Sequence, residues 1–163
     1  MIKLKGFSLI EMLISVVIIT TGIVGTFSVI SSFSEQSKQL RDNFVAAYLV
    51  QEGIEIVKNI RDTNRIQSNL WDDGLENCYT GCEASYNDST LSSWVGEGRV
   101  LYIENSSGHY KYLDVPASND VRTYYKRRIT IATITENEVE IRIDVYWEDK
   151  SMTAKTIIYN WEL

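Results

Sequence analysis

The stretch Gly6-Phe7-Ser8-Leu9-Ile10-Glu11 opens an almost uninterrupted apolar run that continues to Ile30. As an α-helix, residues 7–30 would be about 36 Å long, enough to cross a bilayer core of about 30 Å. Glu11 is the one charged residue within this run. A carboxylate is costly in lipid unless it finds a partner. The stretch therefore predicts a membrane-spanning helix in which Glu11 has a functional role.

The residues before the apolar run set its expected orientation. Lys3 and Lys5 precede Phe7, and positive charge close to a membrane span tends to stay in the cytoplasm. An ordinary secretory signal carries its small cleavage-site residues after the apolar region, whereas Gly6 lies before it. Because glycine has no side chain, a protease can approach the backbone closely at this point. We expect the N-terminus inside and a cleavage site ahead of the helix.

The segment Lys5-Gly6-Phe7-Ser8-Leu9-Ile10-Glu11-Met12-Leu13 resembles the cleavage and methylation signature of type IV prepilins and type II secretion pseudopilins. The resemblance implies that a prepilin peptidase removes a leader of residues 1–6 by cutting between Gly6 and Phe7. The same enzyme would methylate the new amine of Phe7. In this family, Glu11 of an incoming subunit pairs with the N-terminal amine of its neighbour. Loss of one member of a buried pair costs about 3–5 kcal/mol, so Glu11 would set the register of assembly.

The resemblance also implies an α+β pilin fold with a long N-terminal helix. Its apolar half, residues 7–32, would lie in the membrane. Its amphipathic half, residues 33–62, would pack on an antiparallel sheet of about four to five strands. The implied partners are other pilin or pseudopilin subunits, the peptidase and methylase, an inner-membrane assembly platform and membrane lipid. The chain would lie in the cytoplasmic membrane before assembly, and in an extracytoplasmic filament or on the cell surface afterwards.

The implied function is that of a structural subunit of a type IV pilus or type II secretion-like filament, and not that of an enzyme. Residues 47–55 resemble the helix segment of minor pseudopilins and PilV-like minor pilins. Many major pilins carry a proline near the position of Ser28, and this run has none. We therefore expect a minor subunit. The alternatives are a major pilin, and a pilin-like adhesin or DNA-binding tip protein.

A second helical pattern follows the apolar run. Within residues 40–60, helical spacing places four apolar residues on one stripe: Ala47, Val50, Ile54 and Val57. We expect this stripe to cover the sheet and the helix to end near residues 61–64. A coiled-coil seam is the alternative, but the segment is shorter than the three to four heptads that would indicate one.

Residues 63–98 are polar and predict a long structured loop that contains Cys78 and Cys82, the only cysteines. Gly81 permits a tight turn between them, and an extracytoplasmic location favours oxidation to a disulfide. A redox-active pair is less favoured, because three residues separate the cysteines where thioredoxin-like motifs have two. A zinc site lacks ligands, since His109 is the only histidine.

Alternating apolar and polar residues predict an antiparallel sheet in residues 99–163. A hairpin is expected from residues 100–104 and 110–113, which flank a turn rich in serine and glycine. Three longer strands are expected at residues 123–135, 138–147 and 153–161, with turns at 136–137 and 148–150. Several tyrosines could form either a subunit contact surface or cross-strand pairs: Tyr110, Tyr112, Tyr124, Tyr125 and Tyr159.

The charge balance argues against nucleic acid as a partner. The net charge is −6, and loss of Lys3 and Lys5 with the leader would make it −8, whereas nonspecific binding depends on neutralising phosphates. The basic run at residues 126–128 is a local exception. On a strand its side chains alternate between faces, and we expect them to pair with nearby carboxylates.

The sequence offers no support for catalysis or for a cofactor. It contains no Ser/His/Asp order and no phosphate-binding glycine loop, and the usual general base, histidine, occurs once. Five carboxylates in the loop raise the alternative of a calcium site: Asp72, Asp73, Glu76, Glu83 and Asp88. Their order does not match an EF-hand, so a solvated acidic loop and no bound metal are expected.

Overall fold

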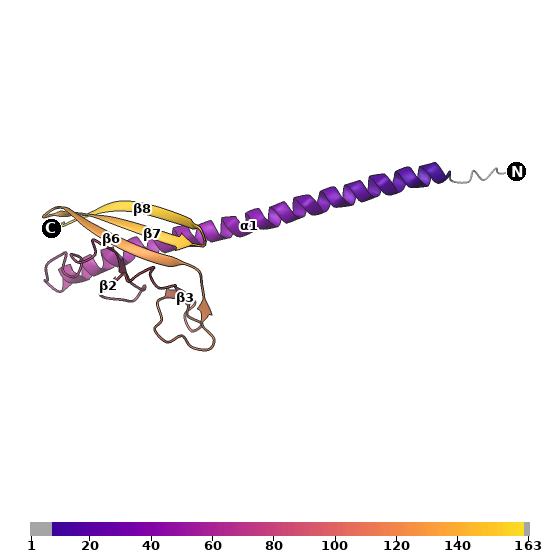
Figure 1. Cartoon of the computed structure of the whole chain (residues 1–163). Helices are drawn as coiled ribbons and strands as arrows, with labels where there is room; N and C mark the ends of the chain where they lie inside the picture. The colour runs from indigo at the N-terminus through magenta and orange to yellow at the C-terminus, as the bar shows by residue number, and fades with distance from the viewer. Residues whose placement is uncertain (1–7, 162–163) are drawn as a thin grey trace. The chain divides into compact units, whose positions relative to one another are not determined.

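The computed structural model describes residues 8–161, which form one helix and eight strands (Figure 1). Helix α1 spans Leu9–Ile66. The strands are β1 (Cys82–Glu83), β2 (Ser92–Ser93), β3 (Tyr102–Ile103), β4 (Tyr110–Lys111), β5 (Val121–Arg122), β6 (Lys126–Thr135), β7 (Glu138–Trp147) and β8 (Lys150–Tyr159). The chain divides into two compact units, Met1–Asp42 and Asn43–Leu163.

The first unit consists, in its described part, of the apolar portion of α1. Its large apolar side chains are exposed, and the helix is long and apolar enough to cross a membrane. The hydroxyls within it are satisfied by the helix itself, since Thr20 and Thr21 each donate to a carbonyl one turn earlier at 2.8 Å. Such internal bonding is what a hydrocarbon environment requires. These features fit the predicted membrane span.

In the second unit, α1 presents an apolar face that differs from the predicted one. Val50 and Val57 are buried as expected, but Ala47 is exposed and Ile54 is only half-buried. The face is rotated toward a row spaced three and four residues apart: Ala46, Leu49, Val50, Gly53, Ile56, Val57 and Ile60. Gly53 explains the rotation, because a Cβ there would meet Ile143 Cγ2 at 3.0 Å, so the helix approaches the sheet closely along this line.

The helix ends later than predicted, at Ile66. Ser68 follows in the left-handed region with φ 60°. Its amide donates to Arg65 O at 3.1 Å, and the amide of Asn69 donates to Asn64 O at 2.9 Å. These two bonds form a Schellman motif, which usually has glycine at the position occupied here by Ser68. Because serine stands where glycine usually marks the end of a helix, the sequence carries only a weak signal for this end.

The strands form two antiparallel sheets, a five-stranded sheet in the order β2-β1-β6-β7-β8 and a three-stranded sheet in the order β4-β3-β5. The predicted hairpin is present as β3 and β4, and β7 matches the predicted range. The first and third long strands differ, because β6 begins at Lys126 and β8 begins at Lys150. Lys150 pairs with Trp147 across a two-residue turn in which Glu148 has φ 50°, so it belongs to the strand and not to the turn.

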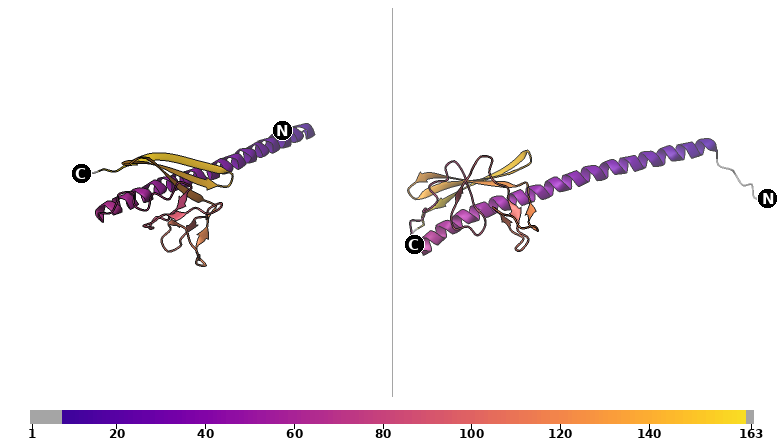
Figure 2. Two further views of the ribbon diagram at one scale, coloured as in Figure 1. Left: turned by 60° about the vertical axis from the view of Figure 1, so that its left-hand side comes forward. Right: turned by 60° about the horizontal axis from the view of Figure 1, so that its bottom comes forward.

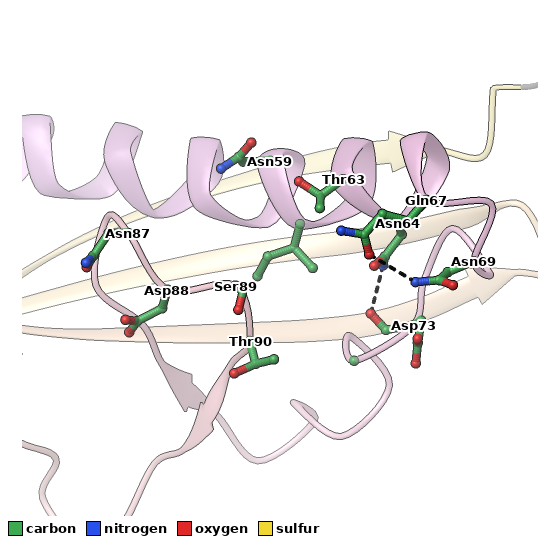
Figure 3. Close-up of a pocket in the computed structure, with 12 residues that line it drawn as sticks. Asn59, Thr63, Asn64, Gln67, Asn69, Asp73, Asn87, Asp88, Ser89 and Thr90 are labelled. Carbon is green, nitrogen blue, oxygen red and sulfur yellow. Dashed lines mark hydrogen bonds between the residues drawn. The ribbon is translucent and has the colours of Figure 1, made fainter.

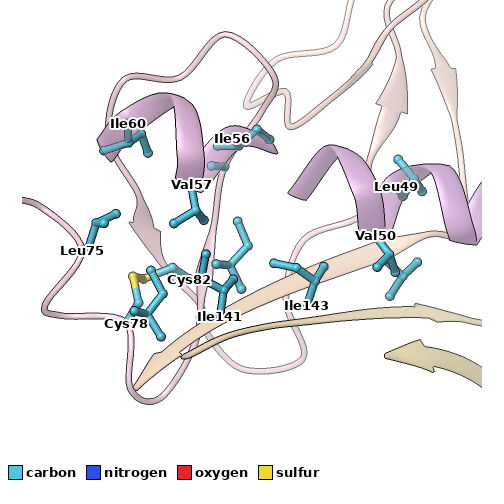
Figure 4. Close-up of a cluster of buried hydrophobic side chains, with 14 of the residues drawn as sticks. Leu49, Val50, Ile56, Val57, Ile60, Leu75, Cys78, Cys82, Ile141 and Ile143 are labelled. Carbon is cyan, nitrogen blue, oxygen red and sulfur yellow. A yellow bond between two sulfur atoms is a disulfide. The ribbon is translucent and has the colours of Figure 1, made fainter. Parts of the chain in front are cut away.

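The core lies between the C-terminal part of α1 and one face of the long strands, which cross beside these helical turns (Figure 2). Val139, Ile141, Ile143 and Val145 alternate inward along β7 and are buried. Figure 4 shows the side chains of α1 and β7 meeting the disulfide in one cluster. The structure is therefore α+β, with a long N-terminal apolar helix and an antiparallel sheet, as predicted.

Candidate functional site

Glu11 lies in the first turn of α1, where a carboxylate interacts favourably with the helix dipole. It is surrounded by exposed apolar side chains, including Leu9, Ile10 and Met12. Its carbonyl accepts a hydrogen bond from Ser15 Oγ at 2.8 Å, but no described residue pairs with its carboxylate. The geometry leaves this acid available to a cation from outside the described part of the chain.

The other two predicted processing residues, Gly6 and Phe7, lie outside the described residues. Cleavage between them and methylation of Phe7 thus stay predictions.

Further along α1, Ile19, Gly22, Ile23, Thr26, Phe27 and Ile30 line one shallow apolar hollow of about 370 Å³. A Cβ added at Gly22 would meet nothing within 4 Å. Small residues on a membrane helix allow another helix to approach closely. The hollow is therefore suited to helix packing.

Cys78 and Cys82 form the expected disulfide, with a Cα–Cα distance of 5.3 Å. Gly81 has φ 119° and so makes the turn between them. Both cysteines are buried, and the ring is attached to β6 at two points: Cys82 pairs with Ile129, and the amide of Ile131 donates to Cys78 O at 3.1 Å. The disulfide fixes the polar loop to the middle of β6.

An internal ion pair joins α1 to β6. The Arg127 guanidinium is fully buried and donates to a carboxylate oxygen of Glu52 at 2.6 Å. It also donates to Leu49 O at 3.1 Å and to Ala84 O at 2.6 Å. The pairing predicted for the basic run is present at Arg127, and its carboxylate partner, Glu52, comes from α1. Arginine at an inward-facing strand position was the available signal, since such a side chain needs a buried acceptor.

Tyr112 closes the same region. Its hydroxyl donates to Arg127 O at 2.8 Å, and burial raises the pKa of Tyr112 well above its usual range. Tyr125 is also buried, whereas Tyr124 and Tyr159 are exposed. Burial in the core thus accounts for Tyr112 and Tyr125, Tyr110 on β4 is half-buried, and the other two remain at the surface.

The rest of the basic run is also paired. Asp144 accepts hydrogen bonds from Arg128 at 3.1 Å, Arg142 at 3.0 Å and Thr153 at 2.6 Å. Burial opposes its ionisation, but these hydrogen bonds outweigh that effect and hold the pKa of Asp144 below its usual range. Lys126 reaches Glu97 at 3.5 Å. The prediction that carboxylates neutralise residues 126–128 is confirmed.

The acidic loop residues do not come together as one cluster. Glu83 is buried and receives hydrogen bonds from the backbone and side chain of Arg99, at 2.8 and 2.7 Å. The side-chain hydrogen bond with Glu83 also raises the pKa of Arg99. Asp88 instead accepts from the amide of Ser85. Within residues 8–161, no three His, Cys, Asp or Glu side chains are placed to hold a metal ion.

A polar pocket of about 420 Å³ lies between the last turns of α1 and residues 87–90 (Figure 3). The turn at residues 69–74 closes one end. Asn64 fastens this turn by donating to Asp73 O at 2.9 Å. The sequence predicted a helix up to about residue 62 and a polar loop from residue 63, but nothing in the chain order indicates that residues 59–67 and 87–90 face each other.

Comparison with known proteins bears on the N-terminal segment. Residues 1–27 match the family model described as the prokaryotic N-terminal methylation motif. No curated protein and no solved structure gives a significant match to the chain. The matched segment includes Gly6, Phe7 and Glu11, and it supports a processed, pilin-like subunit anchored in the membrane.

Proposed function

We propose that this protein is a minor pilin or pseudopilin, a structural subunit of a type IV pilus or type II secretion-like filament. The observation that carries the proposal is the methylation motif at residues 1–27, most of which forms the exposed, apolar start of a helix long enough to cross a membrane. A folded second unit with its own core and disulfide suits the extracytoplasmic side.

The proposed mechanism has two steps. A prepilin peptidase first hydrolyses the peptide bond between Gly6 and Phe7, and transfer of a methyl group from a methyl donor to the new amine then gives a cationic secondary amine. Glu11 of an incoming subunit next pairs with this amine on its neighbour. Both charges are unfavourable alone in lipid, so their pairing favours assembly over the free membrane-bound state.

Processing is tested by mass spectrometry of the membrane-extracted protein. The expected chain begins at N-methylated Phe7, and Gly6→Val should leave Met1 in place because the added side chain obstructs the backbone at the cleavage site. A strain lacking the peptidase provides the control. Retention of Met1 in a strain with an active peptidase would contradict the proposal.

The assembly role is tested with Glu11→Gln, which removes the charge and keeps the shape. We expect normal membrane insertion and greatly reduced incorporation into sheared filaments. Thr20→Val is the matched control, since it removes a polar group from the same helix without touching Glu11. Equal incorporation of both variants would refute the pairing role.

The minor role rests on the sequence of residues 47–55 and on the absence of a proline in the apolar run. Quantitative mass spectrometry of purified filaments would measure the ratio of this chain to the major subunit. A minor subunit should be present as a small fraction, whereas a ratio near or above one would identify a major pilin.

A further inference from the structure

The polar pocket beside the end of α1 has the dimensions of a ligand site. Its volume of about 420 Å³ falls within the range of about 300–1,000 Å³ for small-molecule sites. Figure 3 shows its walls coming from separate parts of the chain, the helix at Asn59 and Thr63 and the loop at Ser89 and Thr90.

The hydrogen-bonding groups of this pocket are largely unused by the fold. Asn59, Thr63, Asn87, Ser89 and Thr90 line it, and their side chains make no hydrogen bond with any other residue in the described part of the chain. Asn64 and Gln67 differ from these residues because their side chains make hydrogen bonds within the fold. Asn64 donates to the turn at residues 69–74, and Gln67 accepts a hydrogen bond from Asn69 at 3.4 Å. The pocket thus combines a fixed wall with free amide and hydroxyl groups on two sides.

The lining disfavours an anionic ligand and fits one that carries hydroxyl groups. Ile60 supplies the single apolar side chain of the pocket, and the lining as a whole exposes polar and apolar atoms in about equal measure, which suits a molecule that presents both hydroxyl groups and C–H faces. The pocket has no lysine or arginine in its lining, and its two carboxylates, Asp73 and Asp88, would repel an anion. Amide and hydroxyl groups both donate and accept hydrogen bonds, which matches the hydroxyls of a sugar. We propose that this pocket binds a neutral saccharide.

This binding would be separate from filament assembly, because the pocket lies wholly in the second unit and Glu11 lies in the first. It would give the subunit an adhesive function in addition to a structural one. Failure of saccharide binding would leave the assembly proposal intact, and the reverse also holds.

The test uses the full chain in lauryldimethylamine oxide micelles, since this detergent has no sugar headgroup that would compete. A printed array of neutral, sialylated and sulfated glycans identifies the best neutral glycan, whose affinity is then measured by titration. Saturable binding to neutral glycans is the expected result. Absence of binding to every neutral glycan, or a preference for sialylated or sulfated ones, would overturn the proposal.

The location is tested with the double variant Asn59→Ala and Thr63→Ala. Alanine is the best helix former, and neither side chain bonds to the fold, so the variant should remain folded. Loss of two hydrogen bonds should weaken binding by about tenfold or more. Gln51→Ala, an exposed position on the same helix outside the pocket, should bind as the wild type does. Unchanged affinity in the double variant would also overturn the proposal.

Discussion

Removing the charge of Glu52 tests how the second unit is held together. Arg127 has no exposed side-chain surface, and the side chain of Glu52 is 12% exposed, so the ion pair between them is almost completely shielded from solvent. Glu52→Gln keeps the shape and leaves a buried guanidinium without its counter-charge. The matched control is Glu55→Gln on the same helix, where Glu55 meets Lys58 at 3.1 Å on the surface.

The size of the effect follows from the contacts that remain. Loss of one member of a buried pair costs about 3–5 kcal/mol. Arg127 would retain its bonds to two carbonyls, so we expect the lower end, about 3 kcal/mol, which is about 10–15 °C in melting temperature for a unit of this size. The exposed pair of the control contributes less than about 1 kcal/mol.

Tryptophan fluorescence during urea unfolding of the full chain in micelles would measure both variants. All four tryptophans lie beyond residue 70, so the signal reports on the second unit. The double variant Glu52→Leu and Arg127→Met should recover most of the lost stability, because it removes both buried charges. If Glu52→Gln unfolds at the same urea concentration as Glu55→Gln, this account of the ion pair is wrong.

Three further predictions concern the same unit. Gly53→Ala should lower the free energy of unfolding by about 1 kcal/mol, as measured by urea unfolding. The new Cβ would meet the buried Ile143 at 3.0 Å, and this overpacking outweighs the gain in helix propensity. Reduction of the disulfide, or Cys78→Ser with Cys82→Ser, should cost about 2 kcal/mol for so small a ring, seen as a lower melting temperature with reductant. Asp144 contributes to the free energy of unfolding at pH values above the ordinary carboxyl pKa of about 3.9. This contribution is lost as the pH falls through the lower pKa that Asp144 has in the folded state. Asp144→Asn should therefore flatten the loss of stability between pH 5 and 3, and an unchanged slope would contradict the assigned hydrogen bonds.

The elements with strong local patterns were predictable from the sequence. The alternation of Val139, Ile141, Ile143 and Val145 identified β7 and its inward face, since a strand with one buried face has a period of two. The turn of Cys78-Tyr79-Thr80-Gly81-Cys82 brings the two cysteines close together, and the expected extracytoplasmic location favours their oxidation to a disulfide. Both features depend on neighbours within a few residues.

The features that depend on distant contacts could not be predicted. Helical spacing fits several adjacent stripes, and the choice of the one through Gly53 was decided by close contact with Ile143. The pairing of Glu52 with Arg127 joins residues 75 positions apart. The polar pocket likewise arises because the loop returns to the end of α1, and local propensity carries no information on such a return.

The attachment of the disulfide ring to β6 has a consequence for how the sheet could extend. Unpaired strand edges accept strands from other chains, and natural proteins commonly block them. The ring occupies the middle of β6, and β2 beyond it has only two residues. In the five-stranded sheet this leaves β8 as the long open edge, so an added strand would have to dock there. Lys150 lies at the start of this edge, and its positive charge discourages indiscriminate aggregation.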